Sequence, residues 1–134
     1  MAALNLEIIT PERVVLQAEA TSVTAPGVQG YLGVLPEHAP LITPLQAGVV
    51  TCRQQAGGEE RLAVSGGFLE AGPDRVIILA DTAERAGEID VDRARQARER
   101  AEQRLRERPP GLDVARAEAA LRRATARLQA AGAL

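Results

Sequence analysis

The spacing of apolar residues changes at Ile89, and this change divides the chain into two kinds of structure. Before Ile89, short runs in which apolar and polar residues alternate are separated by Gly and Pro, as in strands joined by turns. After Ile89, apolar residues recur at every third or fourth position, which is the helical period. Strands followed by helices favour an α+β protein with two parts. We therefore expect an N-terminal antiparallel β-sandwich at residues 1–84 and a C-terminal antiparallel two-helix hairpin at 85–134.

The first part contains several short segments with the strand pattern. Apolar and polar residues alternate over 4–9, which predicts a strand with one buried face. The continuous apolar run at 76–79 predicts a strand that is covered on both faces. Gly66 and Gly67 interrupt the pattern and indicate a bulge or a tight crossing of strands rather than a phosphate-binding loop, because no helix follows them. Further strands are expected at 14–16, 20–25, 31–34, 49–53, 61–64 and 68–70.

The stretch from Gly30 to Pro44 holds the only tyrosine, the only histidine and three of the eight prolines. Each proline fixes its own φ, lacks an N–H donor and favours an extended residue before it, so this stretch is expected to be a stiff loop and not a helix. Its apolar residues are too many for a solvated loop. They are either buried by the same domain or part of a docking surface, since exposed apolar clusters usually mark a partner.

The two helices of the second part have clear start and stop signals. Asp90 is a suitable N-cap for the first helix and Asp113 for the second, and the Pro-Pro-Gly sequence at 109–111 separates them. A turn this short folds the helices back as an antiparallel pair. Much of their seam is alanine, so the hairpin buries little area and must dock, bind a ligand or change shape. The seam of the second helix is Val114, Ala117, Leu121, Ala124, Leu128 and Ala131.

The charge of the chain is unevenly distributed. All 16 basic residues are arginines. Residues 1–89 carry eleven acidic residues and five arginines, a net charge of −6, whereas residues 90–134 carry seven and eleven, a net charge of +4. This asymmetry indicates a charged partner for the basic half. Without lysine, the chain has neither a phosphate loop of the GxxxxGK[ST] type nor Schiff-base chemistry.

The chain has one histidine, His38, and one cysteine, Cys52. Metal centres and catalytic dyads need several such groups together, so we predict no metal site, no catalytic residue and no required cofactor. The lone cysteine allows no intrachain disulfide and fits a reducing compartment. No apolar run approaches the ~20 residues that span a bilayer, and the first residues match neither a signal peptide nor an Arg-rich transit sequence.

Several segments together resemble a known family. In chain order they read GYLG at 30–33, PEHAPL at 36–41, VSGGFLE at 64–70, VIILADTAER at 76–85 and IDVDRA at 89–94. They extend over almost the whole chain, and in this order they resemble the epsilon subunits of bacterial F-type, proton-translocating ATP synthases. The resemblance implies a β-sandwich followed by a helical hairpin, in agreement with the pattern of apolar residues.

The resemblance also implies a function. Such a chain is a non-catalytic rotor subunit of the central stalk, bound to the gamma subunit and to the membrane c-ring. It couples proton-driven rotation to ATP synthesis at the cytoplasmic face of the bacterial cell membrane, as a peripheral subunit. Its hairpin extends into the alpha/beta catalytic head and restrains ATP hydrolysis. The residues expected to dock on the ring are Tyr31, His38, Leu41 and Ile42, although the family often has a carboxylate in place of Tyr31 and a glycine in place of Glu37.

In several members of the family the closed hairpin binds ATP, which is thus expected here as a regulatory ligand. The spacing of the arginines is compatible with such a site. Arg93 and Arg100 share one helix face, and folding the helices back near residue 110 places Arg93 opposite Arg127. Like charges placed so close repel unless an anion joins them, as a triphosphate would. The positions that the resemblance carries over are Glu84, Ile89, Asp90, Arg93, Ala94, Arg100, Arg123 and Arg127.

The remaining arginines of the hairpin allow three interpretations: a solvated helix face, a nucleic-acid surface or a surface for an acidic protein. Interleaved aromatics and nucleic-acid-binding motifs are absent from the sequence. The resemblance favours the acidic catalytic subunits as partner, with Arg98, Arg104 and Arg122 as contacts. Two other functions stay open at this point. They are a free-standing Arg-rich adaptor that binds RNA or acidic proteins, and a nucleotide hydrolase, against which the missing phosphate loop counts.

Overall fold

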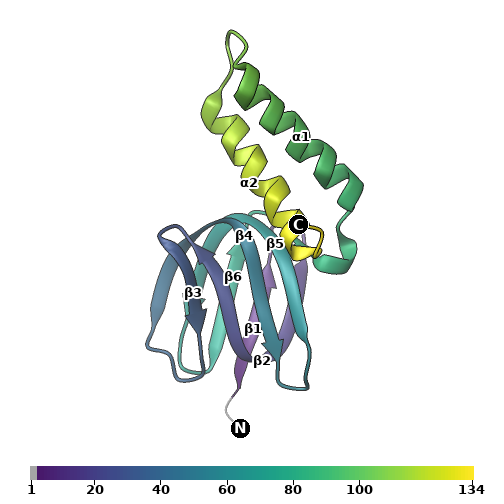
Figure 1. The fold of residues 1–134 in the computed structure, drawn as a ribbon. Coiled ribbons are helices and arrows are strands. Elements are labelled where there is room, and N and C mark those ends of the chain that lie inside the picture. Colours follow the sequence, from purple (N-terminus) through teal and green to yellow (C-terminus); the bar gives the residue numbers. More distant parts are fainter. Residues whose placement is uncertain (1–2) are drawn as a thin grey trace.

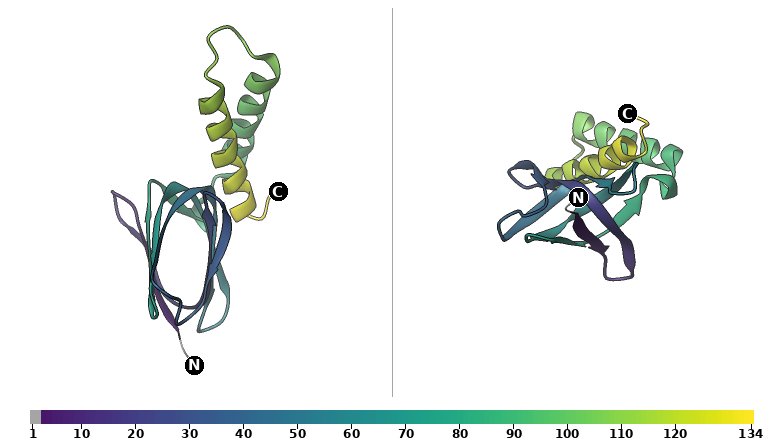
Figure 2. Two further views of the ribbon diagram at one scale, coloured as in Figure 1. Left: turned by 90° about the vertical axis from the view of Figure 1, so that its left-hand side faces the viewer. Right: turned by 90° about the horizontal axis from the view of Figure 1, so that it is seen from below.

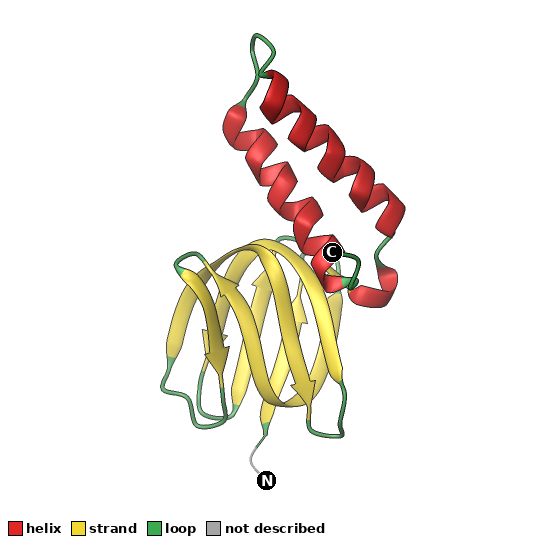
Figure 3. Cartoon of the chain, viewed as in Figure 1, coloured by secondary structure: helices red, strands yellow, loops and turns green. Residues whose placement is uncertain are grey.

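The computed structural model describes residues 3–134 and contains a β-barrel from one end of which a helical hairpin projects (Figure 1 and Figure 3). Residues 1 and 2 of the predicted first part lie outside the described residues. The strands are β1 (Leu4–Ile9), β2 (Val14–Gly27), β3 (Gly30–Val34), β4 (Leu41–Gln54), β5 (Glu59–Ala71), β6 (Arg75–Ala80) and β7 (Ala83–Arg85). A 3₁₀ turn, η1 (Ala86–Glu88), leads into the helices α1 (Val91–Glu107) and α2 (Val114–Ala130). The predicted order of strands followed by two helices is confirmed, and β7 spans the predicted boundary at residue 84.

The strands form one sheet that closes on itself, as the outline in Figure 2 shows. Neighbouring strands follow the order β1-β6-β5-β4-β2, and β2 pairs again with β1, while β3 and β7 extend β2 and β5. β1 and β6 are parallel, so the expectation of a purely antiparallel sandwich is wrong at this pair. Hairpin turns fix the direction of strands that follow one another. No turn joins β1 to β6, and their direction follows from the closure of the sheet.

Several predicted strands are parts of longer ones. The predicted strands 14–16 and 20–25 both belong to β2, which pairs with β1 through its first half and with β4 through its second half. The predicted strands 61–64 and 68–70 are likewise one strand, because β5 continues through Gly66 and Gly67. The tight crossing of strands predicted at these glycines is confirmed. Gly67 has a φ of 134°, and a Cβ atom there would collide with the carbonyl oxygen of Leu79. The glycine pair therefore permits a close approach of β5 and β6.

Aliphatic side chains from alternate strand positions fill the barrel. The predicted covering of both faces at 76–79 is wrong, since Val76 and Ile78 are buried but Leu79 is 54% exposed. The helices lie at the end of the barrel and not over the outer face of β6 (Figure 1). Cys52 lies in the interior, and burial raises the pKa of its thiol. The largest fully buried side chains of the barrel include Leu4, Leu6, Ile8, Leu62, Leu69 and Ile78.

Both helices begin at the predicted caps. Asp90 Oδ1 accepts a hydrogen bond from the backbone N–H of Arg93 at 3.1 Å, and Asp113 Oδ1 accepts one from the backbone N–H of Arg116 at 3.0 Å. These bonds satisfy donors that the first helical turn leaves free. The turn at 109–111 then reverses the chain, so that α1 and α2 pack side by side (Figure 1). The predicted two-helix hairpin is confirmed.

The hairpin contacts the barrel through the C-terminal half of α2. Ala126 and Ala130 pack against Val49 of β4 and Ala63 of β5, and Ile89 of the linker packs at the edge of this cluster. We call these five residues the alanine contact. It is made almost entirely of small side chains, so it holds the hairpin on the barrel with little buried area. Within residues 3–134, neither helix is long and apolar enough to cross a membrane.

Candidate functional site

A cavity of about 600 Å³ lies where the linker and both helices meet the edge of the barrel. Glu84 comes from β7, Arg93 and Arg100 from α1, and Arg127 from α2. The structure thus brings together most of the residues predicted to bind ATP. Because strand, linker and both helices contribute, this cavity exists only while the hairpin is folded back on the barrel. Its full lining is Thr82, Glu84, Glu88, Asp90, Arg93, Ala94, Ala97, Arg100 and Arg127.

The glutamates of this cavity already have partners. Glu84 Oε1 lies 2.5 Å from Arg127 Nε, and this ion pair joins α2 to β7. Glu88 Oε2 lies 3.0 Å from Nη2 of Arg13 in the β1–β2 turn. The backbone N–H of Arg85 donates to Glu88 Oε1 at 3.1 Å, and this bond, helped by Arg13, lowers the pKa of the Glu88 carboxyl. The linker is therefore fastened to the barrel independently of the helices.

Two arginines of the cavity lack a carboxylate partner. Within residues 3–134, neither Arg93 nor Arg100 forms a side-chain ion pair. Asp90, the acidic residue of the cavity lining that is nearest in sequence to Arg93, accepts the backbone N–H of Arg93 at the start of α1. Ala94 is buried beside these residues and has a side chain too small to fill the cavity. Unpaired guanidinium groups around a partly enclosed space favour an anionic ligand.

Two of the predicted ATP-binding residues lie outside this cavity. Ile89 belongs to the alanine contact, where it packs against the cluster that joins α2 to the barrel. Arg123 lines a narrow pocket of about 10 Å³ together with Glu84 and Arg127. It also lines a larger cleft, together with Arg100, nearer the tip of the hairpin. Arg123 therefore lies beside the first cavity and does not line it.

The residues predicted to dock on the ring lie in different elements. His38 belongs to the loop 35–40, which follows β3 at the end of the barrel opposite the helices (Figure 1), and its Nδ1 is 2.6 Å from the carbonyl oxygen of Ala39. Leu41 and Ile42 were expected in this loop, but they begin β4, because β5 offers them a pairing partner. Leu41 packs partly against the core, whereas Ile42 is 72% exposed.

Tyr31 connects two strands of the barrel. It lies in β3, and its Oη accepts a hydrogen bond from the backbone N–H of Val49 in β4 at 2.9 Å. Its hydroxyl lies close above Gly48, where an added Cβ would be 2.8 Å from Oη. The side chain is nevertheless 56% exposed. The hydroxyl group is thus already bonded within the chain, and the exposed aromatic ring of Tyr31 offers mainly apolar surface to a partner.

An exposed apolar strip on the outer face of the barrel was missed by sequence reasoning. Phe68 of β5 and Leu79 of β6 are cross-strand partners and are 56% and 54% exposed. On the opposite side of β5 from Leu79, Pro44 of β4 pairs with Phe68. Ile42 lies two residues before Pro44 and therefore on the same face of the sheet. We call these four residues the outer apolar strip. The continuous apolar run at 76–79 was its signal, because alternate residues of a strand face outward.

The arginines predicted to contact the catalytic head differ in exposure. The Arg98 side chain is 34% exposed, lies 3.4 Å from Glu102 through Nε, and has that nitrogen buried. Arg104 and Arg122 are exposed. In the closed hairpin, Arg104 and Arg122 are therefore better placed than Arg98 to meet an outside surface.

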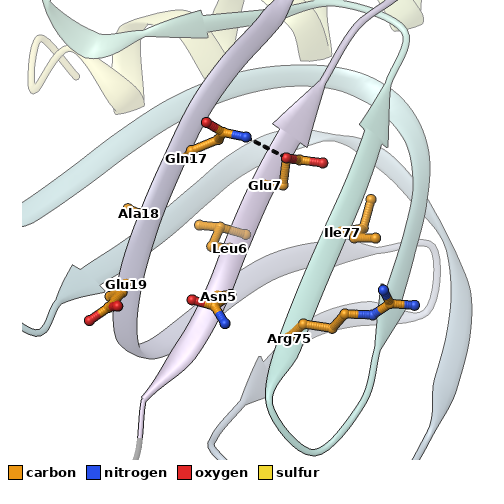
Figure 4. Close-up of a pocket in the computed structure, with 8 residues that line it drawn as sticks. All are labelled: Asn5, Leu6, Glu7, Gln17, Ala18, Glu19, Arg75 and Ile77. Carbon is orange, nitrogen blue, oxygen red and sulfur yellow. Dashed lines mark hydrogen bonds between the residues drawn. The ribbon is translucent and has the colours of Figure 1, made fainter.

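A shallow groove of about 530 Å³ crosses the outer faces of β1, β2 and β6 (Figure 4). Gln17 Nε2 donates to Glu7 Oε2 at 2.6 Å across it, and Glu19 and Arg75 lie at its lower end in the figure. Its polar side chains are partly satisfied by one another. None of the residues predicted to bind ATP, the ring or the head lines it, so it stands apart from the candidate sites.

Comparison with known proteins agrees with this fold. Family models described as the beta-sandwich domain and the long alpha-helix domain of ATP synthase delta/epsilon chains match residues 3–86 and 88–132. The chain is 86% identical to the ATP synthase epsilon chain of Moorella thermoacetica over 100% of both chains. It is 54% identical to that of Desulforamulus reducens over 95% of this chain and 96% of the relative. A chain in the Euglena gracilis mitochondrial ATP synthase (OSCP/F1/c-ring) has a TM-score of 0.84 at 25% identity, over 98% of this chain and 82% of that chain.

The barrel, the hairpin and the two matched domain models define a delta/epsilon-type subunit of an ATP synthase. Within this class, the chain belongs to the family of ATP synthase epsilon chains. The predicted assignment as a rotor subunit is thereby confirmed. The alternative of a free-standing Arg-rich adaptor is not supported.

Proposed function

We propose that this chain is a non-catalytic central-stalk subunit whose barrel couples rotation to ATP synthesis and whose hairpin restrains ATP hydrolysis and senses ATP. The observation that carries the proposal is the position of the basic cavity. Glu84 of the barrel and Arg93 and Arg127 of the two helices line the same space. A ligand that contacts all three binds only the closed hairpin. ATP would then keep the hairpin away from the catalytic head while the nucleotide is abundant.

The energies involved are of similar size, which is what such a switch needs. A fully buried valine side chain contributes about 1.5–3 kcal/mol, and alanines contribute less, so the alanine contact is worth only a few kcal/mol. Charge-assisted hydrogen bonds contribute about 1.5–3 kcal/mol each. A ligand at about 100 times its Kd stabilises the form that it binds by roughly 2.7 kcal/mol. ATP is thus able to shift the hairpin between closed and open.

The cavity residues suggest separate roles. Arg93 and Arg100, which have no ion-pair partner within residues 3–134, are proposed to bind the phosphates. Arg127 is proposed to bind the phosphates while it stays joined to Glu84. The carboxylates of Asp90 and Glu84 are proposed to accept hydrogen bonds from the ribose or the adenine. Their positions at the linker and β7 place them at the barrel side of the cavity. The small Ala94 leaves room for the ligand, Ile89 supports the linker, and Arg123 contributes from the edge.

Calorimetric titration of the full chain with ATP tests this site. We expect a Kd between roughly micromolar and millimolar, because association costs offset much of the contact energy. Arg93→Ala should weaken binding by about tenfold or more, the equivalent of one charge-assisted hydrogen bond. Arg95→Ala is the matched control, since Arg95 lies on the same helix but its ion pair is with Asp92, outside the cavity. Absence of binding at millimolar ATP would remove the site.

We propose that the outer apolar strip docks on the gamma subunit. Four neighbouring apolar side chains exposed on one face are costly in water unless a partner covers them. Phe68→Asp should therefore abolish co-purification with gamma while the barrel stays folded, because a buried unpaired carboxylate is strongly unfavourable. Leu134→Asp is the control, since Leu134 is 59% exposed but follows α2 and belongs to no strand of the barrel. Equal retention of gamma by both variants would exclude the strip.

The loop 35–40 is proposed to rest on the membrane ring, which makes the subunit peripheral at the cytoplasmic face of the membrane. The Tyr31 hydroxyl bonds Val49 of the alanine contact, so the proposed contact of Tyr31 with the ring involves the outer edge of β3 and not this end of the barrel. The loop lies at the end of the barrel that faces away from the hairpin (Figure 1). Such a position allows the barrel to contact the ring while the hairpin points toward the head. Ile42 lies where this end meets the outer apolar strip. Ile42→Asp should therefore uncouple proton flow from ATP synthesis. Leu41→Asp should have a smaller effect on coupling, which arises only from disturbed packing. Normal coupling in a folded Ile42→Asp variant would contradict the ring contact.

A further inference from the structure

A second basic cleft, of about 580 Å³, lies between α1 and α2 toward the tip of the hairpin. Four arginines line it: Arg100 and Arg104 from α1, and Arg116 and Arg123 from α2. Asp113 is the only acidic residue of its lining. All of its lining residues belong to the hairpin, so the cleft does not need the barrel. It differs in this respect from the cavity proposed for ATP.

The protein does not balance the positive charge of this cleft. Within residues 3–134, none of the four arginine side chains forms an ion pair or a hydrogen bond. Asp113 uses its Oδ1 to accept the backbone N–H of Arg116 at 3.0 Å. Guanidinium groups repel one another more strongly beside protein than in bulk water, because the effective dielectric constant is lower. A bound anion would relieve this repulsion.

Arg116 occupies a position that helix stability alone does not favour. It lies in the first turn of α2, where the macrodipole is positive and acidic residues are preferred, yet this turn contains no acidic residue. Arg104, in contrast, lies in the last turn of α1, where a basic residue is favourable. An anion in the cleft would be attracted both by Arg116 and by the N-terminus of α2. An anionic ligand in the cleft therefore accounts for a basic residue at position 116, whereas the stability of the helix does not.

We propose that this cleft is a second binding site, adjoining the first cavity, for phosphate-chain anions of the tripolyphosphate class. Arginine forks bind phosphate oxygens bidentately, and four of them around one space suit a chain with several charged oxygens. The space is larger than one orthophosphate needs. Its remaining walls are mostly alanine, with no aromatic side chain on which a base would stack. The phosphate chain belongs either to a free polyphosphate or to a nucleotide held in the first cavity, because Arg100 lines both spaces.

Titration of the full chain with tripolyphosphate tests the proposal. Replacing Arg104 and Arg116 together by Ala should weaken binding by about tenfold or more, since two charged contacts are lost. The matched control replaces Arg106 and Arg122 by Ala, which removes the same charge from α1 and α2 outside the cleft. This control should stay within about twofold of the unchanged chain. Circular dichroism verifies that every variant keeps its helices.

Three results would overturn the proposal: no binding at millimolar tripolyphosphate, equal weakening by the matched control, or unchanged binding after the Arg104/Arg116 double replacement. The last result would place the anion outside this cleft. Parallel titrations with ATP identify the source of the phosphate chain. If the Arg104/Arg116 double replacement weakens ATP binding as well, the cleft holds the nucleotide's own phosphates; unchanged ATP binding indicates a free anion. Binding of tripolyphosphate without binding of ATP would refute the nucleotide site alone.

Discussion

The barrel and the hairpin differ in the size of the buried side chains that hold each of them together. The barrel encloses large aliphatic side chains, among them Leu6, Leu62 and Ile78, which are at most 2% exposed. The hairpin is built around alanines, and only Leu128 is a large, fully buried side chain there. Burial free energy rises with apolar area, so the same number of buried positions stabilises the barrel far more. The barrel is therefore the more stable part, and the hairpin is held on it by little buried area.

The charges follow the same division. The ion pairs of the barrel and linker, such as Arg13–Glu88 and the Arg85–Glu60 pair, fasten neighbouring strands and the linker. In the hairpin, several arginines line clefts without any acidic partner in residues 3–134. Like charges held close together repel one another, so a bound anion would stabilise this part of the hairpin. The barrel thus has its ionic partners within the chain, whereas the proposed ligand would supply them in the hairpin.

The largest effect is expected in the barrel. Leu62→Ala removes a fully buried side chain and should lower the free energy of unfolding by about 2–5 kcal/mol. Ala117→Gly in the hairpin is the comparison, and should cost only about 1 kcal/mol, mainly through helix propensity. Urea unfolding followed by circular dichroism measures both. Equal losses of unfolding free energy at the two sites would contradict the conclusion that the barrel is the more stable part.

A smaller effect is expected at the alanine contact. Ala130→Asp places a carboxylate where the side chain is fully buried. The hairpin can leave the barrel, so the cost is limited to the free energy of closing, about 1–3 kcal/mol. Hydrogen exchange should increase in α2 and stay unchanged in β4 and β5. Faster exchange throughout the barrel would show that the two parts unfold together.

The arginines predicted to contact the catalytic head are expected to contribute less. Replacing Arg98, Arg104 and Arg122 together by Ala should relieve the restraint on ATP hydrolysis in the reassembled enzyme. Exposed ion pairs are worth about 0.2–1 kcal/mol each, so the change should be several-fold at low salt. It should shrink at high ionic strength, because exposed charges are screened. Unchanged hydrolysis at low ionic strength would exclude these residues as contacts with the head.

The smallest effect concerns the linker and pH. The Arg85 amide and then Arg13 hold the pKa of Glu88 below its ordinary value of 4.5, so folding favours the carboxylate. This contribution is complete above pH 4.5 and is lost as the pH falls further, through the lower pKa of the folded chain. Hydrogen exchange at residues 86–88 should therefore increase in acid. Glu88→Gln should remove this dependence on pH. Equal protection of the linker from hydrogen exchange at acid and neutral pH would contradict a stabilising role of the Glu88 carboxylate.

What the sequence determined by itself is local. The change of apolar period, the caps Asp90 and Asp113, the turn at 109–111 and the alanine seam all act within a few residues, so pattern and propensity predict them. The arginines on one helix face follow from the same periodicity. Together with the motifs that resemble the epsilon family, these features were sufficient for the fold class and the assignment.

What the tertiary structure decided depends on residues far apart in the chain. The parallel pairing of β1 with β6, the continuity of β2 and the exposure of Leu79 follow from the closure of the sheet, which no single segment encodes. The Glu84–Arg127 ion pair joins residues 43 positions apart. The cleft around Arg116 likewise depends on the register in which the two helices meet. Contacts of this kind are set by packing of the whole chain, because long-range pairing depends on every intervening turn and not on local preference.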